Sequence, residues 1–320
     1  MKQYVKDLKQ GDKVESVFAV KFKKPPKRYA HGQMFELRVS DKSDEITAKY
    51  WGDDDLESIQ ALYDSFSKGD VVQLTGSVNE YRGTLEIAIS KGDGDTLDKR
   101  AEGEYEVGDF VARTPKDIVE MAERLKKMIG SVSDHHLKGL LRSFLGEEEF
   151  LEEFSFAPAS MHYHQNYIGG LLEHTLNVAE LCETSARLFP KLDRDLMVTG
   201  ALLHDIGKTR EFEVTTSIDV TEEGMLRGHL IIGEDMVSVM LDANPDFPDV
   251  LRNKILHIML SHHGQLEYGS PKEPQFPEAM AVYYADETDA KIDLLVRMRD
   301  EAKTDDPWTW TKRTGHVYLK

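Results

Sequence analysis

The sequence predicts an α+β protein of two parts, a five-stranded β-barrel followed by an all-α domain. Two observations lead to this prediction. Residues 11–92 contain five short runs of β-branched and aromatic residues, each bounded by turn-forming residues, and the chain after Pro115 has the apolar spacing of amphipathic helices. The length of 320 residues is enough for two ordinary domains. We expect these domains at 1–95 and 116–320, with a linker over 96–115.

The predicted strands are 14–21, 33–40, 45–51, 70–79 and 84–90. In the second strand, Phe35, Leu37 and Val39 alternate with polar residues, which is the pattern of a strand with one buried face. Residues 55–67, between the third and fourth strands, predict a helix. This order matches a Greek-key barrel of the OB type, and Phe35 and Trp51 are expected in its core.

Charge is unevenly distributed along the chain. The whole sequence has a net charge of −18, yet residues 1–40 hold ten lysine and arginine residues and only four acids. This predicts a basic binding face on the first domain, with an ordinary solvated loop as the alternative. Pro25-Pro26 predict an extended basic loop that tracks phosphates, while tyrosines stack on bases. The candidate nucleic-acid-binding residues are Lys21, Lys23, Lys24, Lys27, Arg28, Tyr29 and Tyr81.

Composition also limits the class of protein. The single cysteine, Cys182, excludes intramolecular disulfides and a cysteine-based zinc cluster. No apolar run approaches the ~18 residues of a membrane helix, and the first residues lack the apolar segment of a secretory signal. We therefore expect a cytoplasmic protein without a membrane partner.

Histidines and carboxylates recur at the ends or on the apolar faces of the predicted helices. Imidazole and carboxylate ligands suit divalent transition metals, and an aspartate among several histidines can bridge two ions. The sequence therefore predicts a metal centre in the helical domain. Its candidate residues are His174, His204, Asp205, His229, His262, His263 and Asp286.

The motifs around these residues form an ordered set. They read GGLLEH at 169–174, LLHDIGK at 202–208, SHHG at 261–264 and DETDAK at 286–291. This set resembles the HD-domain phosphohydrolase superfamily. Together with the barrel, and with the segment SHHGQLEYGSPK at 261–272, nearly the whole chain resembles the YhaM family of 3′-to-5′ exoribonucleases.

The resemblance implies a metal-dependent nuclease that converts single-stranded RNA, or single-stranded DNA, to nucleoside 5′-monophosphates. The metal is divalent, with Mn²⁺ expected first and Mg²⁺, Co²⁺ or Fe²⁺ as alternatives. His174, His204, Asp205 and Asp286 would hold one ion, and His229, His262 and His263 would add a second, with Asp205 bridging. His263 has the alternative of supporting a ligand. Lys208 would contact a phosphate oxygen or complement a helix C-terminus, and His164 would contact the substrate.

Several alternatives stay open. The protein could be an HD-domain phosphohydrolase of a small or cyclic nucleotide, or a non-catalytic nucleic-acid-binding adaptor, although the complete ligand set argues against the adaptor. A homo-oligomer is one option for the assembly. Asp289 and Asp293 fit either the site or a solvated acidic stripe. The tail residues either stack on bases or form a packed end; they are Trp308, Trp310, Lys312, Arg313 and His316.

Overall fold

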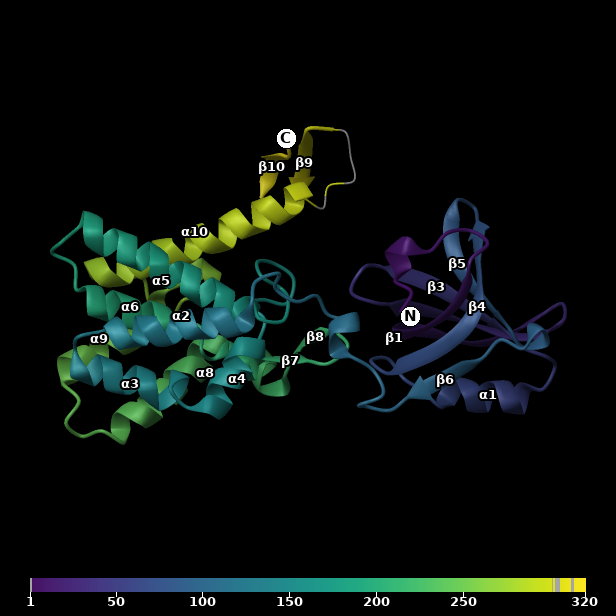
Figure 1. Cartoon of the computed structure of the whole chain (residues 1–320), viewed down its shortest axis with the longest axis horizontal. Coiled ribbons are helices and arrows are strands. Elements are labelled where there is room, and N and C mark those ends of the chain that lie inside the picture. The colour runs from purple at the N-terminus through teal and green to yellow at the C-terminus, as the bar shows by residue number, and fades with distance from the viewer. Residues whose placement is uncertain (1, 301, 303–305, 312–313) are drawn as a thin grey trace. The chain divides into compact units, whose positions relative to one another are not determined.

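The computed structural model describes residues 2–300, 302, 306–311 and 314–320, so Lys312 and Arg313 of the tail lie outside the described residues. The chain divides into two compact units, Met1–Ala112 with Val214–Ser217, and Arg113–Glu213 with Ile218–Lys320. Figure 1 shows that the first is built mainly of strands and the second mainly of helices. The prediction of an α+β protein with a barrel before a helical domain is confirmed.

The first unit is a closed five-stranded barrel. The strand order is β1-β2-β3-β5-β4, and β4 pairs back onto β1. β3 and β5 are parallel, and the other pairs are antiparallel, which is the arrangement of an OB-fold. Helix α1 (Leu56–Asp64) follows β3 at the predicted place, and the Asp55 side chain caps it. The strands are β1 Lys13–Tyr29, β2 Gly32–Ser40, β3 Glu45–Trp51, β4 Val71–Tyr81 and β5 Thr84–Ser90.

Alternation along the strands places apolar side chains inside the barrel. Phe35 and Leu37 are fully buried, and the Phe35 ring stacks on Tyr50 with 5.1 Å between centroids. The prediction that Trp51 lies in the core is wrong. Trp51 is the last residue of β3. It is half-buried, and its ring makes an edge-to-face contact with the ring of Tyr29.

Two segments of this unit differ from the sequence prediction. Residues 21–28 are not a loop but the second half of β1, with a register shift against β2 between Lys24 and Lys27. This bulge contains Pro25 and Pro26, which lack the N–H that a regular strand donates. The segment expected to be a linker contains β6 (Leu97–Arg100), which pairs with β4, so the pattern missed a short sixth strand.

The second unit is helical, with two small hairpins that the prediction of an all-α domain missed. One hairpin joins β7 (Phe212–Val214) to β8 (Ile218–Val220), and the other joins β9 (Trp308–Thr311) to β10 (Gly315–Tyr318). None of the described helices is long and apolar enough to cross a membrane. The helices are α2 Ile118–Ser131, α3 His135–Leu145, α4 Glu148–Phe156, α5 Gly170–Leu188, α6 Arg194–Leu203, α7 Lys208–Glu211, α8 Glu222–Asp242, α9 Asp249–Ser261 and α10 Pro277–Asp300.

Candidate metal centre and nucleic-acid interface

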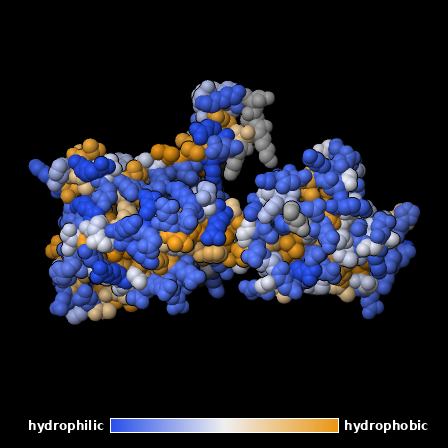
Figure 2. Space-filling view, viewed as in Figure 1, coloured by the Kyte–Doolittle hydropathy of each residue, from blue (hydrophilic) through white to orange (hydrophobic). Residues whose placement is uncertain are grey.

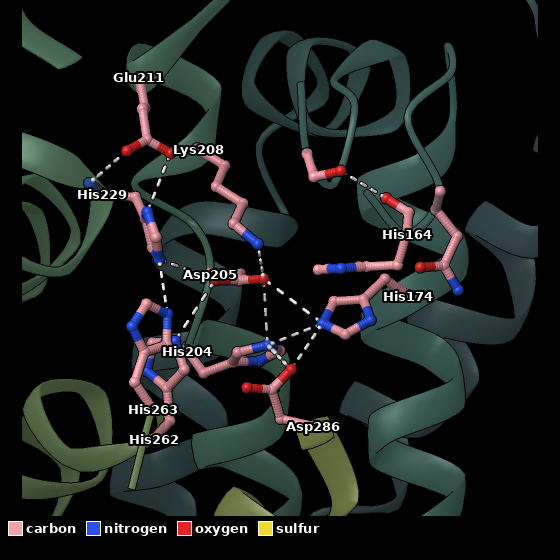
Figure 3. Close-up of polar contacts among 12 residues, drawn as sticks. His164, His174, His204, Asp205, Lys208, Glu211, His229, His262, His263 and Asp286 are labelled. Carbon is pink, nitrogen blue, oxygen red and sulfur yellow. Dashed lines mark hydrogen bonds and ion pairs between the residues drawn. The ribbon is translucent and has the colours of Figure 1, made fainter. Parts of the chain in front are cut away.

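The residues predicted to bind metal come together from five parts of the helical unit. His174 lies on α5, His229 on α8 and Asp286 on α10. His204-Asp205 directly follow α6, and His262-His263 directly follow α9. Figure 3 shows these side chains pointing toward one another around Asp205. The described residues contain three sets in which the donor atoms of the same set all lie within 4.8 Å of one another. The sets are His174, His204 and Asp286; His204, Asp205 and His262; and His229, His262 and His263.

Local sequence explains how the chain reaches this geometry. Helix α6 is buried from Leu196 to Leu203, so its end delivers two polar side chains into the protein interior. A Cβ on Gly207 would lie 2.2 Å from the backbone oxygen of His229, so only glycine lets the backbones of α7 and α8 approach this closely. Gly228 has φ of 69°, a left-handed conformation that kinks α8 directly before His229.

Hydrogen bonds define the protonation of the histidine rings. The Nδ1 atoms of His204, His262 and His263 lie 2.7, 2.7 and 3.1 Å from the backbone oxygens of Ala201, Met259 and Tyr268. A carbonyl oxygen only accepts, so each Nδ1 donates a proton, and in the neutral form of each ring Nε2 keeps a lone pair. The three Nε2 atoms are therefore available as ligands.

The other two histidines are held by carboxylates. His174 Nδ1 donates to Asp289 at 2.7 Å, and His229 Nδ1 donates to Glu211 at 2.9 Å. Carboxylates that accept from a histidine in this way orient the ring and raise its basicity toward a metal. Each side of the centre thus has one carboxylate-held histidine.

The inward-facing atoms lack partners that would balance them. His204 Nε2 lies 3.3 Å from His174 Nε2, and His229 Nε2 lies 3.2 Å from His263 Nε2. Two lone pairs at this distance repel unless a cation or a proton lies between them. Within the described residues, Asp205 Oδ1 is buried without a hydrogen-bond partner. Since a buried carboxylate oxygen without a hydrogen-bond partner is costly, this donor set fits divalent cations.

The carboxylate of Asp205 lies between the two sides. Its Oδ2 is 3.4 Å from His174 Nε2 and 3.2 Å from His204 Nε2. Its Oδ1 is 3.6 Å from His229 Nε2 and 3.5 Å from His262 Nε2. One oxygen therefore faces each group of histidines, which is the geometry expected of a residue that bridges two ions.

The electrostatics of the His174 side favour a bound cation. Burial opposes ionisation of Asp205, but the charges of Lys208 and His204 outweigh it and hold the pKa of this carboxyl well below its usual value. Burial also disfavours the charged form of His174, yet hydrogen bonds with Asp205, Asp286 and Asp289 raise its pKa well above the ordinary value. His174 therefore holds an additional proton when no metal is bound.

The opposite side is neutral. Burial lowers the pKa of His229 and of His262, and burial together with His262 lowers the pKa of His263 to about 4. These three rings are therefore uncharged near pH 7. Neutral imidazoles are the form that binds a metal, so this group needs no deprotonation first.

Two predicted substrate residues lie beside the ligands. Lys208 Nζ is 2.6 Å from Asp205 Oδ2, so this cation pairs with the carboxylate, and Lys208 lies within the single turn of α7. His164 lies in the loop before α5, with its ring 4.9 Å from that of His174. Its Nε2 is buried without a hydrogen-bond partner in the described part of the chain. Burial, His174 and Lys208 hold its pKa well below the ordinary value.

Of the two carboxylates that hold histidines, sequence reasoning left Asp289 open between the site and a solvated stripe, and it missed Glu211. Asp289 also accepts from Gln165 Nε2 at 2.8 Å and from Asn177 Nδ2 at 2.8 Å, so it is not part of a solvated stripe. Asp293 accepts from the backbone N of Gln165 at 2.9 Å. A signal existed for Asp289, which lies three residues after Asp286 and hence on the same helix face. No spacing rule connects Glu211 to His229.

The basic segment of the barrel is only partly available to a ligand. Lys23 Nζ donates to the backbone oxygens of Tyr63 and Phe66 at the end of α1, and lies 3.9 Å from the centre of the Tyr63 ring. Burial lowers its pKa. Lys23 therefore has a structural role, which corrects its assignment to the interface. Lys24 pairs with Glu36 at 2.5 Å, and both side chains remain accessible.

The outer face of the barrel brings further rings and cations together. Pairing of β1 with β2 places Phe22 beside Arg38, and Phe22 is 55% exposed. Pairing of β2 with β3 places Lys49 beside Glu36. Lys49 Nζ lies 5.0 Å from the centre of the exposed Tyr81 ring. Rings and cations thus alternate on this face, as in surfaces that bind single strands.

Comparison with known proteins agrees with both units. Residues 171–291 match the HD domain family model, and residues 17–92 match the model of the OB-fold nucleic acid binding domain. The chain is 31% identical over 281 residues to the 3′-5′ exoribonuclease YhaM of Bacillus subtilis (strain 168), covering 87% of this chain and 83% of the relative. It is 29% identical over 307 residues to the protein of that name from Bacillus velezensis, covering 95% and 92%.

Proposed function

This nuclease belongs to the YhaM family of 3′-5′ exoribonucleases, and we propose that it removes nucleoside 5′-monophosphates from the 3′ end of single-stranded RNA with the help of divalent metal. The observation that carries the proposal is the position of Asp205 between two groups of inward-facing histidines. We propose the cytoplasm as its location, since RNA is its substrate and the single cysteine suits a reducing compartment.

In this proposal the donor atoms hold up to two ions. Mn²⁺ is the proposed metal, as the resemblance to the YhaM family implies, and Mg²⁺, Co²⁺ and Fe²⁺ are the alternatives to compare. When bound, such ions neutralise the scissile phosphate and lower the pKa of water. One ion would take His174, His204 and Asp286, the second would take His229, His262 and His263, and Asp205 would join both.

Lys208 and His164 are the proposed contacts to the reacting phosphodiester. Lys208 Nζ neutralises Asp205 Oδ2 and lies at the edge of the donor set, where it can also reach a phosphate oxygen. The His164 ring is neutral, and its unpartnered Nε2 is available for a hydrogen bond with the phosphate or the leaving 3′ oxygen. Both residues orient the substrate without serving as metal ligands.

The barrel is the proposed binding surface for the single strand. Stacking of a base on an aromatic ring contributes ~1–3 kcal/mol, and Tyr29 and Tyr81 supply exposed or half-exposed rings. Lys24 pairs with Glu36 and Arg38 pairs with Glu45, and because accessible ion pairs are weak, phosphates can replace these carboxylates. The proposed cations are Lys21, Lys24, Lys27, Arg28, Arg38 and Lys49.

A direct test uses chelator-treated protein to which one metal at a time is returned. RNA and DNA oligomers labelled at the 5′ end should shorten to a ladder from the 3′ end, with RNA preferred and nucleoside 5′-monophosphates released. Asp205→Asn should remove this activity. A product ladder that shortens from the 5′ end, or hydrolysis of cyclic dinucleotides while RNA stays intact, would contradict the proposal.

A further inference from the structure

The hairpin of β9 and β10 presents four rings on one face. Its register pairs Trp308 with Tyr318 and Trp310 with His316. Trp308, Trp310 and Tyr318 are 53%, 61% and 57% exposed, and the Trp308 and Tyr318 rings meet edge-on at 5.1 Å. We call these four side chains the aromatic ribbon. Figure 1 shows the hairpin at the C-terminal end of α10.

The opposite face of the hairpin carries its internal contacts. Thr309, Thr311 and Val317 are half-buried, and Thr311 shares a hydrogen bond of 2.7 Å with Thr314. Leu319 is buried, and its backbone N donates to Pro307 at 2.8 Å. The face with the threonine and valine side chains therefore makes the contacts that hold the hairpin together, while the rings on the other face remain exposed. The interpretation of this tail as a packed end is wrong for the rings.

The chemistry of the ribbon favours one kind of ligand. The described residues of this face are all rings, whereas apolar surfaces that dock proteins usually include aliphatic side chains, as α10 does at Ile292, Leu295 and Val296. Figure 2 shows this hydrophobic stretch of α10 leading toward the hairpin. Flat rings suit stacking partners, and every nucleobase has such a face.

Spacing and charge agree with a nucleic-acid strand. Alternate residues of a strand are about 6.6 Å apart, so one base about 3.4 Å thick fits between the rings of Trp308 and Trp310. Residues 306–320 contain three lysine and arginine residues and one acid, in a chain whose net charge is −18. A polyanion is therefore attracted to this segment more than to the average surface.

We propose that the aromatic ribbon is a second binding surface for single-stranded RNA, in addition to the barrel. This inference rests on the proposed exoribonuclease function. Asp286 of the metal centre and the hairpin are joined by the rest of α10, which spans about 21 Å to Asp300. A stacked strand rises about 3.4 Å per nucleotide, so about six stacked nucleotides span this distance from the centre to the ribbon.

Tryptophan fluorescence gives a direct readout. The chain has three tryptophans, so Trp51→Phe leaves Trp308 and Trp310 as the reporters. In chelator, where no cleavage occurs, a uridine 12-mer should quench this emission to saturation, and a uridine trinucleotide at the same nucleotide concentration should not. The absence of quenching by the 12-mer overturns the proposal. This titration does not depend on hydrolysis, so failure of the proposed exonuclease reaction is seen separately.

Matched variants complete the test. Trp308→Ala with Trp310→Ala should raise the Kd for the 12-mer at least tenfold and leave trinucleotide hydrolysis unchanged. Thr309→Ala, on the opposite face of β9, should change neither. Trp310→Tyr keeps a ring and should recover most of the affinity of a Trp310→Ala protein, which separates stacking from misfolding. An unchanged Kd together with a changed sedimentation coefficient would show a protein interface and overturn the proposal.

Discussion

Removal of the Asp289 carboxylate should weaken metal binding on the His174 side of the centre. In the structure, Asp289 Oδ2 accepts from His174 Nδ1 at 2.7 Å, and the His174 ring then directs Nε2 toward Asp286 at 3.1 Å. Asp289→Ala leaves Nδ1 without its acceptor, so the ring can rotate and the proton can move to the nitrogen that should bind the ion. The variant acts on metal affinity through His174, which makes Asp289 a positioning residue.

The size of the effect follows from these contacts. Loss of a carboxylate that supports a ligating histidine typically lowers metal affinity 10- to 100-fold, or ~1.4–2.8 kcal/mol. We expect about 30-fold for Asp289→Ala, because Gln165 and Asn177 also lose their acceptor and no longer restrain the site. Asp289→Asn keeps an oxygen that can accept from His174, so its loss should be smaller, about fivefold.

The assay is titration of chelator-treated protein with Co²⁺, followed by calorimetry and by the visible absorption of the bound ion. Asp293→Asn is the matched control, because its carboxylate lies on the same helix but contacts the backbone of Gln165 and not His174. This control should bind Co²⁺ within twofold of the parent protein. If Asp289→Ala also binds its ions with parental affinity and spectrum, the positioning argument is refuted.

Three further outcomes are expected. Glu211→Gln should lower the affinity of the ion on the His229 side about tenfold in the same titration and leave the other ion unchanged, since Glu211 holds only His229. Metal binding at His174 should weaken as pH falls from 8 to 6, because the raised pKa of His174 means that the ion must displace a proton; equal binding at both pH values would contradict this. Lys23→Met should lower Tm with little change in RNA affinity, since it removes a cap of α1. Lys27→Gln should keep Tm and reduce the salt slope of RNA binding by ~0.7. The reverse pattern would restore Lys23 to the interface.

The barrel could be predicted because its strands alternate and its turns are marked. Two misses have a common physical cause. Pro25-Pro26 usually end a strand, but pairing of both flanking segments with β2 carries β1 through them as a bulge. The four residues of β6 have no clear alternation, and they become a strand only because β4 offers them a free edge. Tertiary pairing, which a local pattern does not contain, decides both cases.

The residues that meet at the centre could be predicted, because their motifs come in the order of the superfamily that the sequence resembles. Glu211, which holds His229, could not, because a carboxylate in the right place can come from any neighbouring element. Asp289 comes from the helix that also carries Asp286, and the i, i+3 spacing marked it. Glu211 and His229 come from different helices, and the kink at Gly228 that brings them together has no periodic signal.

The His174 side of the centre has more carboxylates than the His229 side, which favours a divalent ion there. It also holds a proton that the ion must displace, which disfavours binding. Asp286 and Asp289 give the His174 side two carboxylates beside the shared Asp205, whereas Glu211 alone supports the His229 side. Charge therefore favours a divalent ion at His174. The proton that His174 holds at neutral pH competes with that ion, while the neutral rings of the other side meet no such competition. Only the His174 side must release a proton, so its advantage in binding a divalent ion grows as pH rises. The order in which the two positions bind their ions therefore depends on pH.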